Sequence, residues 1–302
     1  MAYRASAGCS LAASIVAAAT LAMHAQPSAS GDLDGIWNYA TMTPLERPRD
    51  LARATLTPAE AAEYERSTIE RQSNTNNTAG PDWWDPGTRF LTNGRTSLIV
   101  DPSDGRVPPQ TAEAQQRAAA RAQARRAHGP SDGPEDRALN ERCLNWTVAG
   151  PPLLPGVYNN NVQIIQTRGY VAIVSEMIHD ARIVPMDGRP HGTVPQWMGD
   201  SRGRWEGATL VVDTVGFTEK TAFRGSTEHL HLVERFTRTG ADTIEYRFTA
   251  EDPSTWTHPF TAMFPLKKTG GPIYEYACHE GNARSMIGML MGARAQEKPN
   301  ER

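Results

Sequence analysis

From Val162 to Cys278, short segments that alternate apolar and polar residues follow one another at close intervals, with turn residues between them. A period of two puts every second side chain on one face, which is typical of a half-buried β-strand and not of a helix. The first expected hairpin joins Val162–Thr167 to Tyr170–Met177 through Arg168-Gly169, and Ile178–Val184 continues its second strand past a bend. The other expected hairpins are Gly203–Glu206 with Thr209–Thr214 around Gly207-Ala208, His229–Thr237 with Asp242–Ala250 around residues 238–241, and Phe260–Leu266 with Ile273–Cys278 around residues 268–271. With Asp32–Tyr39 and Thr96–Val100 added, there are about ten strands. Because closure removes exposed sheet edges, we expect a mainly β protein, an antiparallel β-barrel or a strongly curved sheet.

The pattern is helical and irregular between about residues 45 and 140. Thr57-Pro58-Ala59-Glu60 combines a capping threonine, a proline in the first turn and a glutamate that can bond back, so a helix should follow it. Residues 111–127 are mostly Ala, Gln and Arg, which favours a second helix on the surface. We expect one domain, residues 26–302, in which this helical insertion lies over one end of the barrel.

The first 25 residues have the layout of a secretory signal. Arg4 is followed by a small and apolar run that is too short to span a bilayer, and Met23-His24-Ala25 ends the segment. We expect cleavage after Ala25, with Ala29 as the alternative site, and a mature protein that is periplasmic or secreted.

Charge and cysteine content limit the partners further. Acidic residues, 34 in number, slightly exceed the 31 basic ones, so nothing indicates binding to nucleic acid. The mature segment has no second apolar run long enough to span a membrane. An oxidising compartment favours a disulfide between Cys143 and Cys278, although two buried free thiols would fit the same spacing. The sequence does not define the oligomeric state.

Several long motifs resemble those of a family of exported bacterial proteins of unassigned function. They are residues 99–109, Tyr158–Asn161, Glu176–Arg182, Trp197–Gly207 and Tyr274–Asn282, and the resemblance extends over residues 32–296. It implies no particular reaction. Separately, Gly35-Ile36-Trp37 is similar to the start of lipocalin-like barrels, which favours the closed form of the sheet.

Two ionisable residues interrupt apolar strand faces. Glu234 shares its face with Leu230, Leu232 and Phe236, where an unpaired carboxylate would be costly and its pKa should rise. His179 lies on the apolar face too if its strand keeps register. A histidine and a carboxyl group in one cavity would form a general acid–base pair. The competing interpretation is that each is a satisfied core residue, with Glu234 in a buried ion pair with Arg182 or Arg235.

Other candidates complete the predicted site. Arg182 or His279 would stabilise developing negative charge, and Glu280 lies beside His279 at the end of an expected strand. The residues predicted to contact a substrate are Tyr246, Phe248, Trp205, Tyr276 and Arg235. We expect no cofactor, because no dinucleotide, phosphate-binding or His-Glu-x-x-His motif is present. We expect no metal either, although His229 and His231, joined by His279 or His191, leave a metal site as an alternative.

The residues thus predict a periplasmic or secreted proton-transfer enzyme, that is, a lyase, dehydratase or isomerase, acting on a small, largely apolar or aromatic molecule. The alternative is a non-enzymatic carrier of the same barrel shape, in which the polar groups only orient the ligand.

Overall fold

A computed structural model describes residues 31–75, 90–146, 148–221 and 223–296. The expected signal segment, residues 1–25, lies outside these residues. The strands are β1 (Gly35–Asn38), β2 (Ile99–Asp101), β3 (Asn161–Gln166), β4 (Tyr170–Ser175), β5 (Ala181–Pro185), β6 (Asp200–Glu206), β7 (Thr209–Val215), β8 (His231–Gly240), β9 (Thr243–Glu251) and β10 (Phe260–Lys268). The helices are α1 (Pro58–Thr75), α2 (Ala112–Ala127) and α3 (Cys278–Gln296).

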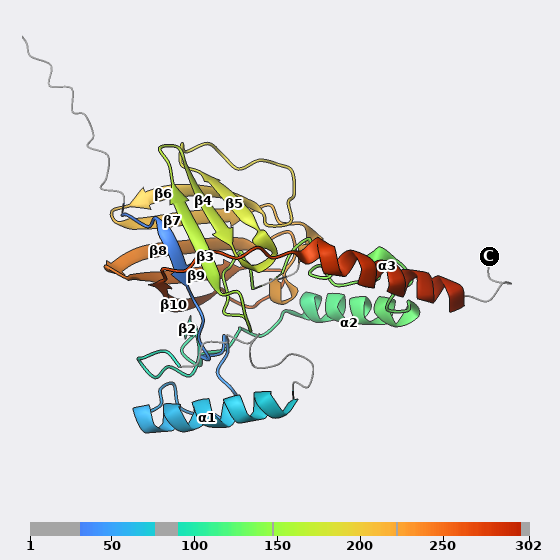
Figure 1. Ribbon diagram of the computed structural model, residues 1–302, viewed down its shortest axis with the longest axis horizontal. Helices are drawn as coiled ribbons and strands as arrows, with labels where there is room; N and C mark the ends of the chain where they lie inside the picture. Colours follow the sequence, from blue (N-terminus) through green and yellow to red (C-terminus); the bar gives the residue numbers. More distant parts are fainter. Residues whose placement is uncertain (1–30, 76–89, 147, 222, 297–302) are drawn as a thin grey trace, which may run out of the picture.

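The sheet is antiparallel and closes almost completely into a barrel, as expected (Figure 1). Its order is β5-β4-β3-β1-β10-β9-β8-β7-β6, with β2 paired to β10 outside this path. The first and last strands, β5 and β6, pack against each other without a hydrogen-bonded ladder. Gly203 permits this approach, because a Cβ atom there would lie 2.3 Å from Met186 Sδ and 2.8 Å from Val184 Cγ1.

The two ends of the barrel differ. The hairpin turns of β3–β4, β6–β7 and β8–β9 lie at one end, which we call the turn end. The other end, which we call the loop end, carries the β4–β5 connection and the longer segments that leave β1, β7 and β9. Residues 186–199 run from the turn end to the loop end, because β5 finishes at the first and β6 starts at the second. This segment therefore spans the open seam.

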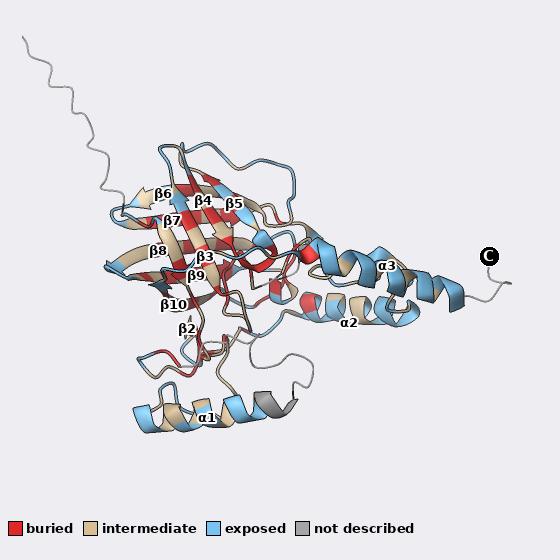
Figure 2. Ribbon diagram, in the orientation of Figure 1, coloured by how far each residue is buried: buried red, intermediate tan, exposed pale blue. Residues whose placement is uncertain are grey.

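Buried residues recur along the strands of the barrel (Figure 2), and their large side chains fill its interior. Tyr246 packs against Phe236 and Phe264 with tilted and edge-on rings, whose centroids are 4.9 and 5.1 Å away. Leu153 is fully buried and belongs to the same core, so the segment that precedes β3 plugs the loop end. The interior is thus a packed core, so a functional site is expected at the ends of the barrel.

Helices α1 and α2 begin where the sequence predicted their starts. Thr57 and Glu60 form the expected reciprocal cap, with the Thr57 amide donating to Glu60 at 2.8 Å and the Glu60 amide donating to Thr57 Oγ1 at 3.3 Å. Thr111 Oγ1 accepts from the Ala114 amide at the start of α2. Among the described residues, no helix is long and apolar enough to cross a membrane.

The prediction of a strand at Ile273–Cys278 is wrong. Residues 273–277 are irregular, and Cys278 begins helix α3 instead of ending a strand. Cys278 is bonded to Cys143, with the two sulfur atoms 2.05 Å apart, so the expected disulfide is present. This bond fixes the first turn of α3 to the segment after α2.

Candidate functional site

Glu234 lies inside the barrel, where it links two strands that are not neighbours in the sheet. From β5, Arg182 donates through Nη1 and Nη2 to the two carboxylate oxygens of Glu234 on β8, at 2.5 and 3.0 Å. The Tyr246 hydroxyl donates to Glu234 Oε1 at 2.6 Å and itself accepts from the Leu153 amide at 3.0 Å. Glu234 is 0% exposed and Arg182 is 6% exposed. The ion-pair interpretation of Glu234, with Arg182 as its partner, is therefore confirmed.

The buried triad of Glu234, Arg182 and Tyr246 is a connected hydrogen-bond network. Burial opposes the charge of Arg182, but the Glu234 carboxylate outweighs it and raises the pKa of the guanidinium. Burial, together with the Glu234 charge, raises the pKa of the Tyr246 hydroxyl well above its usual range. Tyr246 and Phe248 are fully buried among core rings, so the contacts they make are with other core residues. The triad links strands β5, β8 and β9 inside the barrel.

His179 does not face the interior, so the expected pairing of His179 with Glu234 is wrong. Strand β4 ends at Ser175, and a tight turn follows in which Ile178 and His179 adopt left-handed conformations, with φ of 60° and 50°. The turn resets the alternation of side chains. Met177 and Ile178 become buried, and His179 is exposed at the loop end.

The turn brings together residues from three of the sequence motifs. The His179 ring lies 6.5 Å from the His279 ring, centroid to centroid, with their planes 35° apart. His279 occupies the first turn of α3, next to the disulfide, and Glu280 beside it is exposed. Met177 and Ile178 form a small apolar cluster with Tyr158 and Tyr276. His179 and His279 thus meet at the surface, apart from Glu234.

Asp180 follows His179 at the loop end and was not among the predicted site residues. We call His179, Asp180 and His279 the loop-end cluster. Burial raises the pKa of the Asp180 carboxyl to about 6, against a smaller lowering by His179. Its Oδ2 atom is buried and has no hydrogen-bond partner among the described residues. A carboxyl with a pKa near 6 beside imidazoles can take up or release a proton near neutral pH. Its place in the Glu176–Arg182 motif was the only sequence signal for it.

A cleft of about 670 Å³ lies on the other side of the same turn. Most of its lining is apolar and comes from loop-end segments: Met42, Pro44, Leu45, Leu98, Trp146, Val148, Leu154, Pro155, Val157, Met177 and Phe223. Thr41, Thr43 and Thr68 supply polar groups, and Arg224 supplies one charge. Trp146 is held edge-on against Tyr158, with ring centroids 5.9 Å apart. The volume falls within the range of small-molecule pockets, and more of the lining is apolar than polar.

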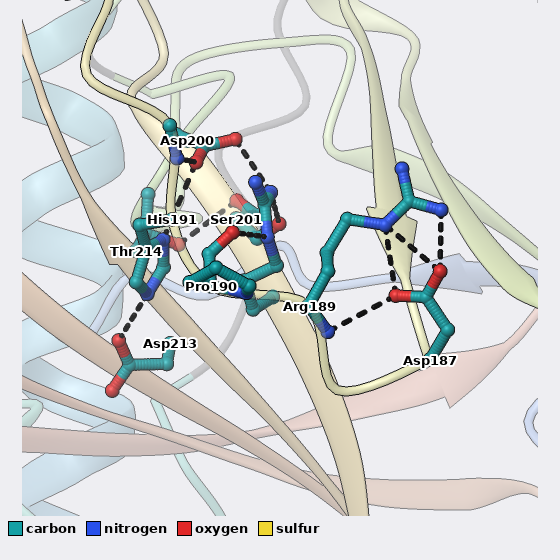
Figure 3. Close-up of polar contacts among 10 residues, drawn as sticks. Asp187, Arg189, Pro190, His191, Asp200, Ser201, Asp213 and Thr214 are labelled. Atoms are coloured by element: carbon teal, nitrogen blue, oxygen red, sulfur yellow. Dashed lines mark hydrogen bonds and ion pairs between the residues drawn. The ribbon is translucent and has the colours of Figure 1, made fainter.

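A polar array on the outer wall contains two of the histidines that had suggested a metal, His191, which Figure 3 shows, and His231. The Asp213 carboxylate lies 2.9 Å from His191 Nε2 and 3.0 Å from His231 Nε2. Burial would raise the pKa of Asp213, but these two contacts lower it below its usual range. Among the described residues, no group of three or more His, Cys, Asp or Glu side chains is placed to hold a metal ion. His229 is exposed and lies before β8.

The array fastens residues 189–192 across the seam. The Gly192 amide donates to Asp200 at 2.7 Å, and Arg202 Nε donates to the Pro190 carbonyl at 3.0 Å. His191 thus lies between Asp213 and Asp200 in Figure 3. This arrangement covers the exposed edge of β6, which is a structural role.

The last two predicted contact residues lie on the barrel wall. Arg235 faces outward and pairs with Glu206 at 2.8 Å. Trp205 is half-buried and packs against the core from β6. Neither lines the loop-end cleft.

The fold and the site together define a nearly closed antiparallel barrel with a plugged interior and a cleft at its loop end. Comparisons with protein-family models, curated proteins and solved structures find no match to this chain.

Proposed function

We propose that this protein is an exported small-molecule-binding protein whose ligand occupies the loop-end cleft and is neutral and largely apolar or aromatic. The observation that carries the proposal is the cleft itself, with its volume of about 670 Å³ and its predominantly apolar lining. Pockets of this size and composition bury most of a small ligand. The leader-like N-terminus and the Cys143–Cys278 disulfide support an oxidising, extracytoplasmic location.

The lining also indicates how a ligand would be held. Trp146 and Phe223 offer ring faces, and their positions are fixed by packing on Tyr158 and on Trp256. Such fixed rings bind apolar molecules with little loss of side-chain entropy. The threonine hydroxyls can orient one polar group of the ligand.

A fluorescent neutral probe, N-phenyl-1-naphthylamine, tests the proposal. Val157 lines the cleft and is 39% exposed, so Val157→Trp fills the cleft with little strain on the core. We expect the wild-type protein to bind the probe and Val157→Trp to bind it at least tenfold more weakly. Val194→Trp is the matched control, because Val194 is 72% exposed and lies outside the cleft. Equal probe affinity in the wild type and Val157→Trp would refute the proposal.

The loop-end cluster of His179, Asp180 and His279 favours a second candidate function, a proton-transfer enzyme of the lyase, dehydratase or isomerase type. Met177 links the two features, because it lines the cleft and belongs to the turn that carries His179. A substrate at the loop end would meet Asp180 as a carboxyl able to exchange a proton near neutral pH. Backbone strain of the kind at Ile178 often accompanies functional groups.

Titration and stability test this candidate. The Asp180 carboxyl should titrate near pH 6 by carbon NMR. Between the unfolded pKa of about 3.9 and this value the folded state holds the extra proton, so stability falls as pH rises through that window. Asp180→Asn should therefore raise the melting temperature at pH 7.5 more than at pH 4.5.

Asp187→Asn is the control with the opposite sign. Hydrogen bonds from Arg189 lower the pKa of Asp187 to about 2, so its removal should not stabilise the protein at pH 7.5. An Asp180 carboxyl that titrates near pH 4 would remove the basis of the enzyme candidate and leave the binding proposal intact.

A further inference from the structure

A second cleft, of about 550 Å³, lies on the outer face of β9 and β10 and adjoins the loop-end cleft at Thr41, which lines both. Residues 90–95 form its opposite wall, and Asn38 and Ala40 form its side. Phe90, Leu91, Met263 and Pro265 make part of the lining apolar. Nothing in the proposed function uses this cleft.

The charges around this outer cleft are unbalanced. Arg95 and Lys267 line it as cations, and Glu245 is the acidic residue of its lining. Glu245 is itself 3.8 Å from the Arg247 guanidinium. Lys267 is exposed, and its Nζ donates to Thr243 Oγ1 at 2.8 Å. The cleft thus carries net positive charge on a protein whose formal net charge is −3.

Arg95 is incompletely satisfied. Its Nη2 donates to the Met263 carbonyl, while Nε and Nη1 are buried and have no hydrogen-bond partner among the described residues. Within the described part of the chain, no carboxylate lies within 4.0 Å of this guanidinium. Burial lowers the pKa of Arg95, which Glu245 only partly offsets. Arg95 is half-buried, and a partly desolvated cation without an anionic partner is costly, so a bound anion would relieve that cost.

We infer that this outer cleft binds a small organic anion, a molecule with an apolar ring and one negatively charged group. The ring would lie against Phe90 and Met263, and the anionic group would be attracted by Arg95 and Lys267. Thr92, Asn93, Thr239 and Thr243 add hydrogen-bonding groups around the charged end. This site shares Thr41 with the loop-end cleft, but its cations and the apolar residues Phe90 and Met263 line only the outer cleft.

Calorimetric titration with 2-naphthoate and with the neutral 2-naphthamide tests the inference, because the two probes differ mainly in charge. We expect the naphthoate to bind at least tenfold more tightly, and its affinity to fall as salt is raised. Naphthalene-2-sulfonate, in a third titration, distinguishes a site for carboxylates from one for tetrahedral oxyanions. Equal affinity for naphthoate and naphthamide, or no binding of any anionic probe at millimolar concentration, would overturn the inference.

Variants locate the site. Lys267→Met should weaken naphthoate binding at least fivefold and leave naphthamide unchanged, and Arg95→Met should weaken it further. Arg204→Met, on exposed β6, removes the same charge elsewhere and should have no effect. If Arg95→Met does not fold, exposed Lys267 still decides the result, since unchanged naphthoate affinity in Lys267→Met would refute the site. Val157→Trp should leave naphthoate binding intact, so failure of one cleft is distinguishable from failure of the other.

Discussion

At the scale of single residues, Glu234 shows how a buried charge can be structural. Removing two charges from water is expensive, and their attraction compensates only when the geometry is good and the remaining lone pairs are bonded. Arg182 supplies two hydrogen bonds and Tyr246 a third, so the carboxylate is well satisfied. The pair also links β5 to β8, two strands that are not neighbours in the sheet, and so contributes to holding the barrel closed.

Removing one charge of this ion pair should lower the stability of the fold more than removing both charges. Arg182→Met leaves Glu234 buried without its cation, and we expect a loss of about 3–5 kcal/mol in the free energy of unfolding. Glu234→Gln should cost a similar amount because Arg182 is then unpaired. The double variant should be more stable than the sum of the two losses predicts, as measured by urea denaturation in a double-mutant cycle.

The outer wall supplies the control for this cycle. Arg235 and Glu206 form a pair of similar length, 2.8 Å, with both side chains 40% exposed. Arg235→Met should change stability by about 0–1 kcal/mol, since exposed pairs contribute little. If Arg182→Met lowers the free energy of unfolding no more than Arg235→Met, the structural role of the Arg182–Glu234 pair is refuted.

At the scale of elements, alternation was a reliable guide wherever a strand had one face on the core. It predicted the hairpins of β3–β4, β6–β7 and β8–β9, and it placed Glu234 on the same face as Phe236. In these hairpins the turn residues and the two apolar faces specify one register. The ion pair with Arg182 was therefore within reach of the sequence as one of two alternatives.

The element boundaries at the loop end were not predictable in the same way. Ile178 is β-branched and adopts a left-handed conformation, which local preferences disfavour. Its burial with Met177 under Tyr158 and Tyr276 offsets this cost, and that packing depends on segments far apart in the chain. Likewise, residues 273–278 alternate like a strand, but tertiary contacts and the Cys143 bond decide that a helix begins there.

The loop-end cluster was consequently predicted only in part. His179 and His279 were both candidates, and the structure brings their rings together, but through the surface and not through the barrel interior. Asp180 was missed because strand alternation says nothing about a residue that follows a reversal of the backbone. Clefts were also beyond the sequence, since both are made from segments that meet only in the folded chain.

At the scale of the whole molecule, the barrel is closed by side chains at one seam. All other neighbouring strands in the sheet order share ladder hydrogen bonds, whereas β5 and β6 meet through Val184, Met186 and Gly203. Residues 189–192 lie over this seam and are tied to Asp200 and Asp213. Packing thus replaces ladder hydrogen bonds at this seam, and the close packing depends on the absence of a side chain at Gly203.

Enlarging Gly203 should open the seam. Gly203→Val places atoms where Met186 and Val184 now lie, and we expect a loss of about 1–3 kcal/mol, typical of overpacking. Hydrogen exchange should then quicken at the amides of β5 and β6 before those of β9 and β10, which are paired on both sides. Met186→Ala, added to Gly203→Val, should recover part of the loss by making room.

Gly207→Ala serves as a glycine control with open space around it, although its φ of 61° adds backbone strain without affecting the seam. Uniform acceleration of exchange across all strands in Gly203→Val would show that the barrel opens as one unit and not at the β5–β6 seam.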